Sequence, residues 1–313
     1  MILVVSHPGD EHARAVLAAL ERRRVRARLL DLAHFPRSLG VTLPYEDGAG
    51  GPTLTPRRGP PIQLEAVEAV WWRRPRPFEL SEAIRDLDRF AFAWRESREA
   101  FAGLWLSLRC RWVNHPARDR DASHKAWQLV LARRLGLSVP RTCITSDPAA
   151  ARAFLAGLGR GGAVMKTLQA SPGEWQPTRM VDARVRRRLG LVRRAPVIFQ
   201  EYIPGVDVRV TVVGRRLFCA SIDSRHTRSP EDFRLALDES RVEAISLPTP
   251  LRRRLLALVR GLDLRYAAVD FRLSENNEWI FLEVNPAGQW LFVEERTGLP
   301  ITDAVAQLLA TGR

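Results

Sequence analysis

The chain has 313 residues, of which 46% are hydrophobic, which is enough for two or three compact lobes with apolar cores. It has no run of about 18 apolar residues and no basic N-terminal region before an apolar one, which argues against a membrane-spanning helix and a secretory signal. The three cysteines are scattered, which argues against a disulfide framework. These features predict a cytoplasmic protein. The formal net charge of +14 indicates an acidic partner, such as a nucleotide together with a carboxylate-bearing substrate or peptide.

The first third of the sequence alternates strand and helix patterns, which is typical of an α/β lobe with a parallel sheet. The expected strands are 3–6, 27–31, 69–73 and 111–116, and the expected helices are 11–24 and a long helical region over 80–108. The segment 40–62 is rich in Gly and Pro and predicts a loop or a ragged hairpin. We place the end of this lobe near residue 115.

Residues 116–199 predict a small central α+β lobe. A helix is expected from Asp121 through Lys125 to a C-terminal stop at Gly136. The other expected elements are a strand at 142–145, a helix opening at Asp147, a strand at 163–168, a loop at 168–178, a basic helix at 181–190 and a strand from 197.

Residues 200–313 are dominated by two hairpin patterns, which predict an antiparallel sheet in a C-terminal α+β lobe. The hairpins cover 208–222 and 266–285. Two helices are expected beside them, at 250–261 with Thr249 as its cap, and at 301–310.

Lysine occurs at two positions, Lys125 and Lys166, although the chain has 49 Lys and Arg residues in total. Arginine suits exposed charge and bidentate contacts, whereas lysine offers a compact, rotatable point charge that fits beside a phosphate in a narrow pocket. The two lysines therefore indicate a phosphate-bearing nucleotide.

The stretch AAVDFRLSENNEWIFLEVN predicts a hairpin with two opposed carboxylates. If the turn spans 274–279, Asp270 lies opposite Glu283, and Asn285 follows on the same face. Leu273 then pairs with Ile280, and the other face is apolar, with Val269, Phe271, Leu273, Ile280, Leu282 and Val284. Opposed like charges destabilise a sheet unless a cation lies between them, and such oxygen ligands suit Mg²⁺. The alternative is a half-exposed hairpin with solvated charges.

The stretch VIFQEYIPGVDVRVTVVG predicts a strand that breaks at Pro204-Gly205 and continues as a second strand. Backbone groups at such a hinge can bind the edge of an adenine base, and Asp207 can accept hydrogen bonds from ribose hydroxyls. A surface turn with a charged rim explains the same pattern equally well.

Together these features resemble the ATP-grasp fold: a lysine on an early helix, a second lysine in VMK, the hinge QEYIPGVDVR and the acidic stretch VDFR…FLEVNP. More narrowly, VWWRRPRPF, NHPARDRDASHKAWQL, QEYIPGVDVRVTVVG and EVNPAGQWLFVE resemble the microviridin-type ATP-grasp peptide ligases, also called graspetide synthetases. The resemblance covers nearly the whole chain. It implies a pre-grasp α/β lobe at 1–115, a central α+β lobe at 116–199 and a C-terminal antiparallel-sheet α+β lobe at 200–313.

The resemblance implies ATP and magnesium as cofactors and assigns residues to each. The two lysines match those that contact the nucleotide phosphates, and the hinge and the acid after it match the adenine and ribose contacts. The implied nucleotide-binding residues are Lys125, Lys166, Glu201, Tyr202, Ile203 and Asp207. The implied metal ligands are Asp270, Glu283 and Asn285.

The resemblance also assigns catalytic roles to three arginines. Arg209 and Arg272 would clamp the transferring phosphoryl group and the acyl phosphate, and Arg234 would hold the substrate carboxylate. The loop before Arg234 departs from the family pattern, because DSR and DFR stand where relatives usually have His-Ser-Gln and Asp-Trp-Arg.

The activity implied by this resemblance is ATP-dependent macrocyclisation of a ribosomal precursor peptide. Asp or Glu side chains would be activated as acyl phosphates and joined to Ser, Thr or Lys side chains through ω-ester or ω-amide bonds, while the loop at 168–178 closes over the nucleotide. A leader peptide is expected on the central lobe, where the basic helix 181–190 is either its docking site or a solvated face. A homodimer is also expected.

Two other functions stay open. One is an ATP-grasp ligase that adds an amino acid to a protein or small molecule, as glutamate ligases do. The other is a basic module that binds nucleotide or nucleic acid without catalysis. The sequence favours no nucleic-acid partner, because it lacks helix-turn-helix and zinc-finger spacing and an aromatic-rich RNA-binding signature.

Overall fold

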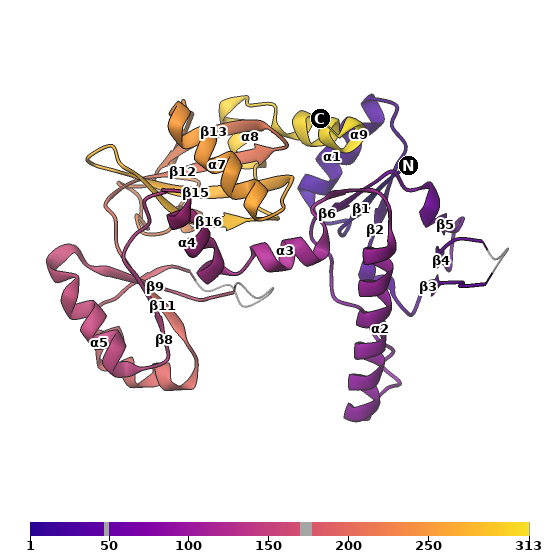
Figure 1. Ribbon diagram of the computed structural model, residues 1–313, viewed down its shortest axis with the longest axis horizontal. Helices are drawn as coiled ribbons and strands as arrows, with labels where there is room; N and C mark the ends of the chain where they lie inside the picture. The colour runs from indigo at the N-terminus through magenta and orange to yellow at the C-terminus, as the bar shows by residue number, and fades with distance from the viewer. Residues whose placement is uncertain (47–49, 170–176, 313) are drawn as a thin grey trace. The chain divides into compact units, whose positions relative to one another are not determined.

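The computed structural model describes residues 1–46, 50–169 and 177–312 (Figure 1). The chain folds into two compact units, residues 1–119 together with 300–313, and residues 120–299. The last helix is therefore grouped with the first unit, whereas the three-lobe division, which stays a prediction, places it in the lobe at 200–313. No helix within the described ranges is both long and apolar enough to cross a membrane.

The first unit is built on a four-stranded parallel sheet with the order β2-β1-β6-β7. Its strands are β1 (Ile2–Val5), β2 (Ala27–Leu30), β6 (Ala69–Trp72) and β7 (Arg111–Val113). Helix α1 (Glu11–Arg22) begins after Asp10, whose carboxylate accepts a hydrogen bond from the backbone N–H of His12. The alternation of strand and helix thus predicts the parallel sheet correctly.

The rest of the first unit differs from the prediction in detail. The segment expected as a loop or ragged hairpin forms a small antiparallel sheet of β3 (Leu39–Thr42), β4 (Thr53–Pro56) and β5 (Ile62–Gln63). Helix α2 (Leu87–Ser107) begins later than expected, after its cap Asp86. Helix α9 (Ile301–Thr311) is joined to α1 by an ion pair between Arg23 and Asp303. Two short 3-10 segments are η1 (Leu32–His34) and η2 (Leu64–Ala66).

The second unit contains two antiparallel sheets, of which the smaller has the order β10-β9-β11-β8. Its strands are β8 (Thr142–Thr145), β9 (Ala163–Lys166), β10 (Arg179–Met180) and β11 (Val197–Glu201). One face packs against α5 (Pro148–Gly157) and the 3-10 segment η4 (Leu189–Arg194), where Phe199 is buried. Alternation along the strands leaves Lys166 and Gln200 on the opposite face.

The helices expected in the central lobe are shorter than the sequence suggests. The single helix expected from Asp121 is two helices, α3 (Pro116–Ala122) and α4 (Lys125–Arg134), and His124 is the cap of the second. The basic helix expected over 181–190 is α6 (Ala183–Arg187), followed by η4. A further 3-10 turn is η3 (Gly159–Gly161).

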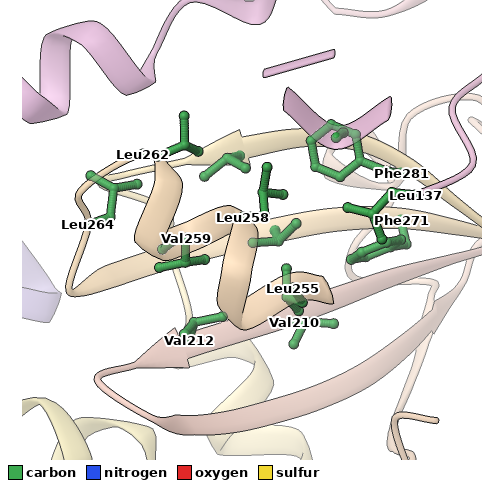
Figure 2. Packing of buried hydrophobic residues seen from close by; sticks show 14 of the residues in the cluster. Leu137, Val210, Val212, Leu255, Leu258, Val259, Leu262, Leu264, Phe271 and Phe281 are labelled. Atoms are coloured by element: carbon green, nitrogen blue, oxygen red, sulfur yellow. The ribbon is translucent and has the colours of Figure 1, made fainter. Parts of the chain in front are cut away.

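The larger sheet has the order β14-β13-β12-β15-β16. Its strands are β12 (Gly205–Val213), β13 (Arg216–Asp223), β14 (Arg241–Ala244), β15 (Tyr266–Ser274) and β16 (Trp279–Asn285). Helix α7 (Thr249–Gly261) lies across one face and packs Leu255 and Leu258 against a core that includes Val210 and Phe271 (Figure 2). The cap of α7 is Pro248 without a side-chain cap bond, so the predicted Thr249 cap is wrong. The 3-10 turn η5 (Phe233–Leu235) and helix α8 (Leu291–Thr297) were not predicted.

A β-bulge between β15 and β16 changes the predicted faces of this hairpin. Asp270 lies opposite Glu283, as predicted, and the next pairs are Phe271 with Phe281, Arg272 with Ile280 and Leu273 with Trp279. Leu282 is therefore the extra residue of the bulge. The predicted pairing of Leu273 with Ile280 is wrong, and the apolar face contains Trp279 and Phe281 in place of Ile280 and Leu282.

Candidate active site

Two adjoining pockets in the second unit contain most of the predicted site residues. One is lined by, among others, Lys125, Lys166, Asp207, Arg234, Asp270 and Glu283. The other lies along the hinge and is lined by, among others, Lys166, Glu201, Tyr202, Ile203, Asp207 and Arg272. Because Lys166 and Asp207 line both, the pockets form one continuous candidate site.

The amide of Asn285 bridges the two opposed carboxylates. Its Nδ2 donates to Oδ2 of Asp270 over 3.1 Å and to Oε1 of Glu283 over 3.3 Å. The three side chains predicted as metal ligands therefore converge on one point between β15 and β16.

Two cations accompany the carboxylates. Nζ of Lys125 lies 3.0 Å from Oε2 of Glu283. The guanidinium of Arg209 donates from Nε to Oδ1 of Asp270 over 2.5 Å and from Nη2 to Oδ2 over 3.2 Å. It lies 5.7 Å from the ring centroid of Phe233 and 5.8 Å from that of Phe292. The rings and the carboxylate together fix the orientation of Arg209.

The surrounding cations keep Glu283 ionised. Burial alone would raise the pKa of this carboxyl group, but Lys125, Lys166 and Arg234 hold that pKa well below its ordinary value. Burial raises the pKa of Asp270, and Arg209 opposes this effect. A divalent cation would favour the charged form of both groups.

The donor set fits a magnesium ion. Magnesium usually takes one or two protein carboxylates together with water and substrate phosphates. Within the described ranges no group of three or more His, Cys, Asp and Glu side chains is arranged to hold a metal. Asp270 and Glu283 would supply two carboxylates, and nucleotide phosphates and water would supply the other oxygen ligands. For Asn285 to act as a ligand, its amide must turn to present Oδ1 in place of Nδ2.

Arg272 forms hydrogen bonds with the hinge. It donates from Nε to the carbonyl oxygen of Ile203 over 2.9 Å, from Nη1 to Oδ2 of Asp207 over 2.5 Å and from Nη2 to the carbonyl oxygen of Pro230 over 3.1 Å. Its Nη2 also lies 3.3 Å from the hydroxyl of Tyr202. Burial raises the pKa of Asp207 to about 6, although Arg272 opposes the shift. The structure thus places Arg272 against the hinge, whereas the resemblance implies a clamp on the phosphoryl group.

Close approach of two strands explains the break predicted at Pro204-Gly205. Gly205 has a φ of +147°, and a Cβ atom there would lie 2.1 Å from the carbonyl oxygen of Leu273. A larger residue would have to push β15 away. Beside the break, Oε2 of Glu201 accepts from the backbone N–H of Arg141 over 3.2 Å, which ties the hinge to the segment before β8.

Arg234 lies in the first pocket beside Asp232. Its Nε and Nη2 each donate to that carboxylate over 2.7 Å. Asp232 also accepts from the backbone N–H of Thr178 over 3.1 Å. The loop predicted to close over the nucleotide spans 168–178, and its residues 170–176 lie outside the described ranges.

Residues 118–309 match the model of the RimK-like ATP-grasp domain. The chain belongs to the RimK-like ATP-grasp family. Residues 1–120 match the MvdD pre-ATP grasp domain. The ATP-grasp fold predicted from the lysines, the hinge and the acidic hairpin is therefore confirmed.

Solved ATP-grasp proteins share this fold over almost the full length. The macrocyclase MdnC from Microcystis aeruginosa MRC, bound with precursor peptide MdnA, is 29% identical with a TM-score of 0.86, over 99% of this chain and 98% of that one. The ATP-grasp ligase PsnB, complexed with minimal precursor, Mg and ADP, is 25% identical with a TM-score of 0.81, over 99% and 96%. The predicted resemblance to the peptide-modifying branch is confirmed.

Curated relatives match a smaller part of the chain. Probable alpha-L-glutamate ligase 1 of Shewanella baltica (strain OS155 / ATCC BAA-1091) is 29% identical over 202 residues, which cover 62% of this chain and 64% of that protein. The chain thus spans less than two thirds of the length of the curated relatives it matches.

Three residues of this ATP-grasp site were not predicted from the sequence. Leu282, the extra residue of the bulge, lines both pockets. Gln200 accepts a hydrogen bond from Lys166. Gln128 is buried one turn after Lys125 on α4 and contacts the backbone of Val284. The available signal for Gln128 was its spacing of three residues from Lys125, which places both on one helix face.

Proposed function

We propose that the chain is an ATP-dependent macrocyclase that acts on a ribosomal precursor peptide. The observation that carries this proposal is similarity along 99% of the chain to a macrocyclase solved with its precursor peptide. The pre-ATP grasp and ATP-grasp domains follow each other here in one chain. A solved relative holds Mg and ADP, which supports ATP and magnesium as cofactors.

The reaction would have two steps. First, a carboxylate oxygen of a peptide Asp or Glu bonds to the γ-phosphorus of ATP, and the bond from that phosphorus to ADP breaks. Second, a Ser or Thr hydroxyl or a Lys amine bonds to the acyl carbon, phosphate leaves, and the proton of the nucleophile passes to phosphate or solvent. The ring closes through an ω-ester or ω-amide bond with the net loss of one water from the peptide.

The site residues would divide this work between binding and charge stabilisation. Lys125 and Lys166 would bind the phosphates of ATP. Magnesium held by Asp270, Glu283 and Asn285 would neutralise charge on the transferring phosphoryl group. Arg209, already oriented by two rings, would contact the acyl phosphate, and Arg234 would hold the peptide carboxylate.

The hinge would bind the nucleoside. Backbone groups of Glu201, Tyr202 and Ile203 would contact the adenine base, and Asp207 would accept from the ribose hydroxyls. We propose that Arg272 orders this hinge, since its donors contact Ile203, Asp207 and Pro230, and that it does not clamp the phosphoryl group.

A groove on the smaller sheet is our candidate for docking the leader peptide. Its apolar lining includes Met165, Met180, Val185, Leu189, Leu191, Val192 and Phe199, and its basic lining includes Arg179, Arg184, Arg188 and Arg194. Met180 is 40% exposed and Leu191 51%. Exposed apolar side chains beside arginines fit an acidic peptide that also carries apolar side chains.

We further propose a cytoplasmic homodimer without a nucleic-acid partner. ATP and ribosomal peptides are both available in the cytoplasm. The start of α2 exposes Leu87, Phe90 and Phe92 by 82%, 44% and 60%, which supports a protein contact there. Sedimentation equilibrium of the full chain tests the dimer, and a monomer at all concentrations would contradict it.

The proposed activity is tested with the peptide encoded by a small open reading frame beside the gene. Incubation with ATP and Mg²⁺ should release ADP and lower the peptide mass by one water per crosslink. Tandem mass spectrometry should locate each bond between an acidic and a hydroxyl or amine side chain. ATP turnover with no mass loss would contradict macrocyclisation.

The glutamate ligases supply a second candidate function. The similarity to probable alpha-L-glutamate ligase 1 favours a ligase that joins a free amino acid to another molecule. ADP release that depends on free glutamate and not on a peptide would support this alternative.

A further inference from the structure

A relay of hydrogen bonds through the buried side chain of Gln200 holds Lys166. Its Nζ donates to Oε1 of Gln200 over 2.8 Å, and Nε2 of Gln200 donates to Oγ1 of Thr142 over 3.0 Å. The hydroxyl of Thr142 donates in turn to the carbonyl oxygen of Pro140 over 2.9 Å. The residues lie on β9, β11 and β8, which are neighbours in the smaller sheet (Figure 1).

Chemistry fixes the direction of this relay. An ammonium group has donors and no acceptor, so Gln200 must present its oxygen to Lys166 and its NH₂ group to Thr142. Thr142 accepts at Oγ1 and uses its own hydrogen toward Pro140. Gln200 is 3% exposed, so bulk water does not replace these contacts.

A neutral acceptor suits a lysine that must bind phosphate. A carboxylate at position 200 would form an ion pair with Lys166 and compete with the phosphate oxygens. An apolar residue would leave the partly buried ammonium without an oriented acceptor. Burial lowers the pKa of Lys166, and the charges of Glu283 and Asp207 oppose this effect.

We infer that Gln200 is a positioning residue that aims the ammonium of Lys166 at the nucleotide phosphates, and that Thr142 fixes the orientation of Gln200. The inference rests on the proposed nucleotide site. Lys166 carries a positive charge, so an error in its position would affect binding of the charged phosphates more than binding of the uncharged base.

Calorimetric binding of ADP and of adenosine to the full chain, without magnesium, tests this role. Gln200→Leu and Gln200→Glu should each weaken ADP binding about 10- to 100-fold, because a hydrogen bond to a charged group is lost or replaced by an ion pair. Adenosine binding should stay within about twofold, because it has no phosphate for Lys166 to bind. The exposed Gln63→Leu is the matched control and should change neither affinity.

The Thr142 variants keep the test informative if a Gln200 variant folds poorly. Thr142→Val should weaken ADP binding about 3- to 10-fold, as expected for the loss of one neutral hydrogen bond. Thr142→Ser keeps the hydroxyl group and should bind ADP as the wild type does. Unchanged ADP binding in both Gln200 variants, or an equal loss of adenosine binding, would overturn the inference. If the wild-type chain bound neither ligand, the proposed nucleotide site itself would be wrong, and the inference with it.

Discussion

The side-chain amide of Gln128 pairs with both backbone groups of Val284. Its Nε2 donates to the carbonyl oxygen over 2.8 Å, and the N–H of Val284 donates to its Oε1 over 2.9 Å. Because β16 is an edge strand, this side chain takes the place of a neighbouring strand at that point. It also joins the helix that begins at Lys125 to the strand that carries Glu283 and Asn285.

Replacing Gln128 with Met should therefore destabilise the second unit and weaken ADP binding. The change leaves the buried N–H and C=O of Val284 without their partner, which should cost about 2–4 kcal/mol in the free energy of unfolding. Urea denaturation and calorimetry measure the two effects. Gln63→Met, at an exposed strand position, is the control, and equal behaviour of the two variants would refute the docking role of Gln128.

Lys166→Ala and Asp270→Asn should each lower the rate of peptide-dependent ADP release by about 100-fold or more, because each removes charge from the site of phosphoryl transfer. The fold should persist, which circular dichroism and thermal melting check. Arg215→Ala, in the exposed turn between β12 and β13, serves as the control and should retain full activity. Substantial turnover in either site variant would remove that residue from the proposed mechanism.

The sequence patterns predict the pairing of Asp270 with Glu283 correctly because these carboxylates occupy the polar positions of an alternating pattern. Trp279 to Leu282 are four consecutive apolar residues, so a period of two cannot decide which of them face the core. Packing decides: the rings of Phe271 and Phe281 meet with centroids 5.9 Å apart, and the bulge places Leu282 in the pocket. This information is absent from the local sequence.

The sequence predicts which residues form the site better than it predicts their hydrogen-bonding partners. Gln128 contacts a residue 156 positions away, and Gln200 contacts residues 34 and 58 positions away. In the sequence Gln128 stands between apolar residues, and Gln200 stands between Phe199 and Glu201. In both cases the tertiary fold sets the hydrogen-bonding partner. For the same reason the sequence did not reveal that Arg272 contacts the carbonyl oxygens of Ile203 and Pro230.

Arg272→Lys distinguishes the two roles considered for that residue. Lysine keeps the charge but cannot reach Ile203, Asp207 and Pro230 with one planar fork. If Arg272 orders the hinge, KM for ATP should rise about 10-fold or more while kcat changes less, because ground-state nucleotide binding is lost. A large fall in kcat with unchanged KM would instead support the phosphoryl clamp.

Burial raises the pKa of Asp207 in the folded chain to about 6, which makes the stability of the chain depend on pH. The folded chain then binds this proton more tightly than the unfolded chain, where the pKa is the ordinary 3.8. Asp207 therefore contributes stability that is complete below pH 3.8 and is lost as the pH rises to about 6. The affinity for adenosine should rise over the same pH range, because only the ionised carboxylate accepts hydrogen bonds from both ribose hydroxyls.

Comparison with Asp207→Asn isolates this single group, because Asn does not titrate and other ionisations largely cancel in the difference. Between pH 4 and 8 the unfolding free energy of the variant minus that of the wild type should rise by roughly 2–4 kcal/mol. This difference should level off above pH 7. A constant offset from loss of the ion pair with Arg272 does not affect this slope. A flat difference over the whole range would mean that Asp207 stays ionised throughout, because the contact with Arg272 then outweighs burial.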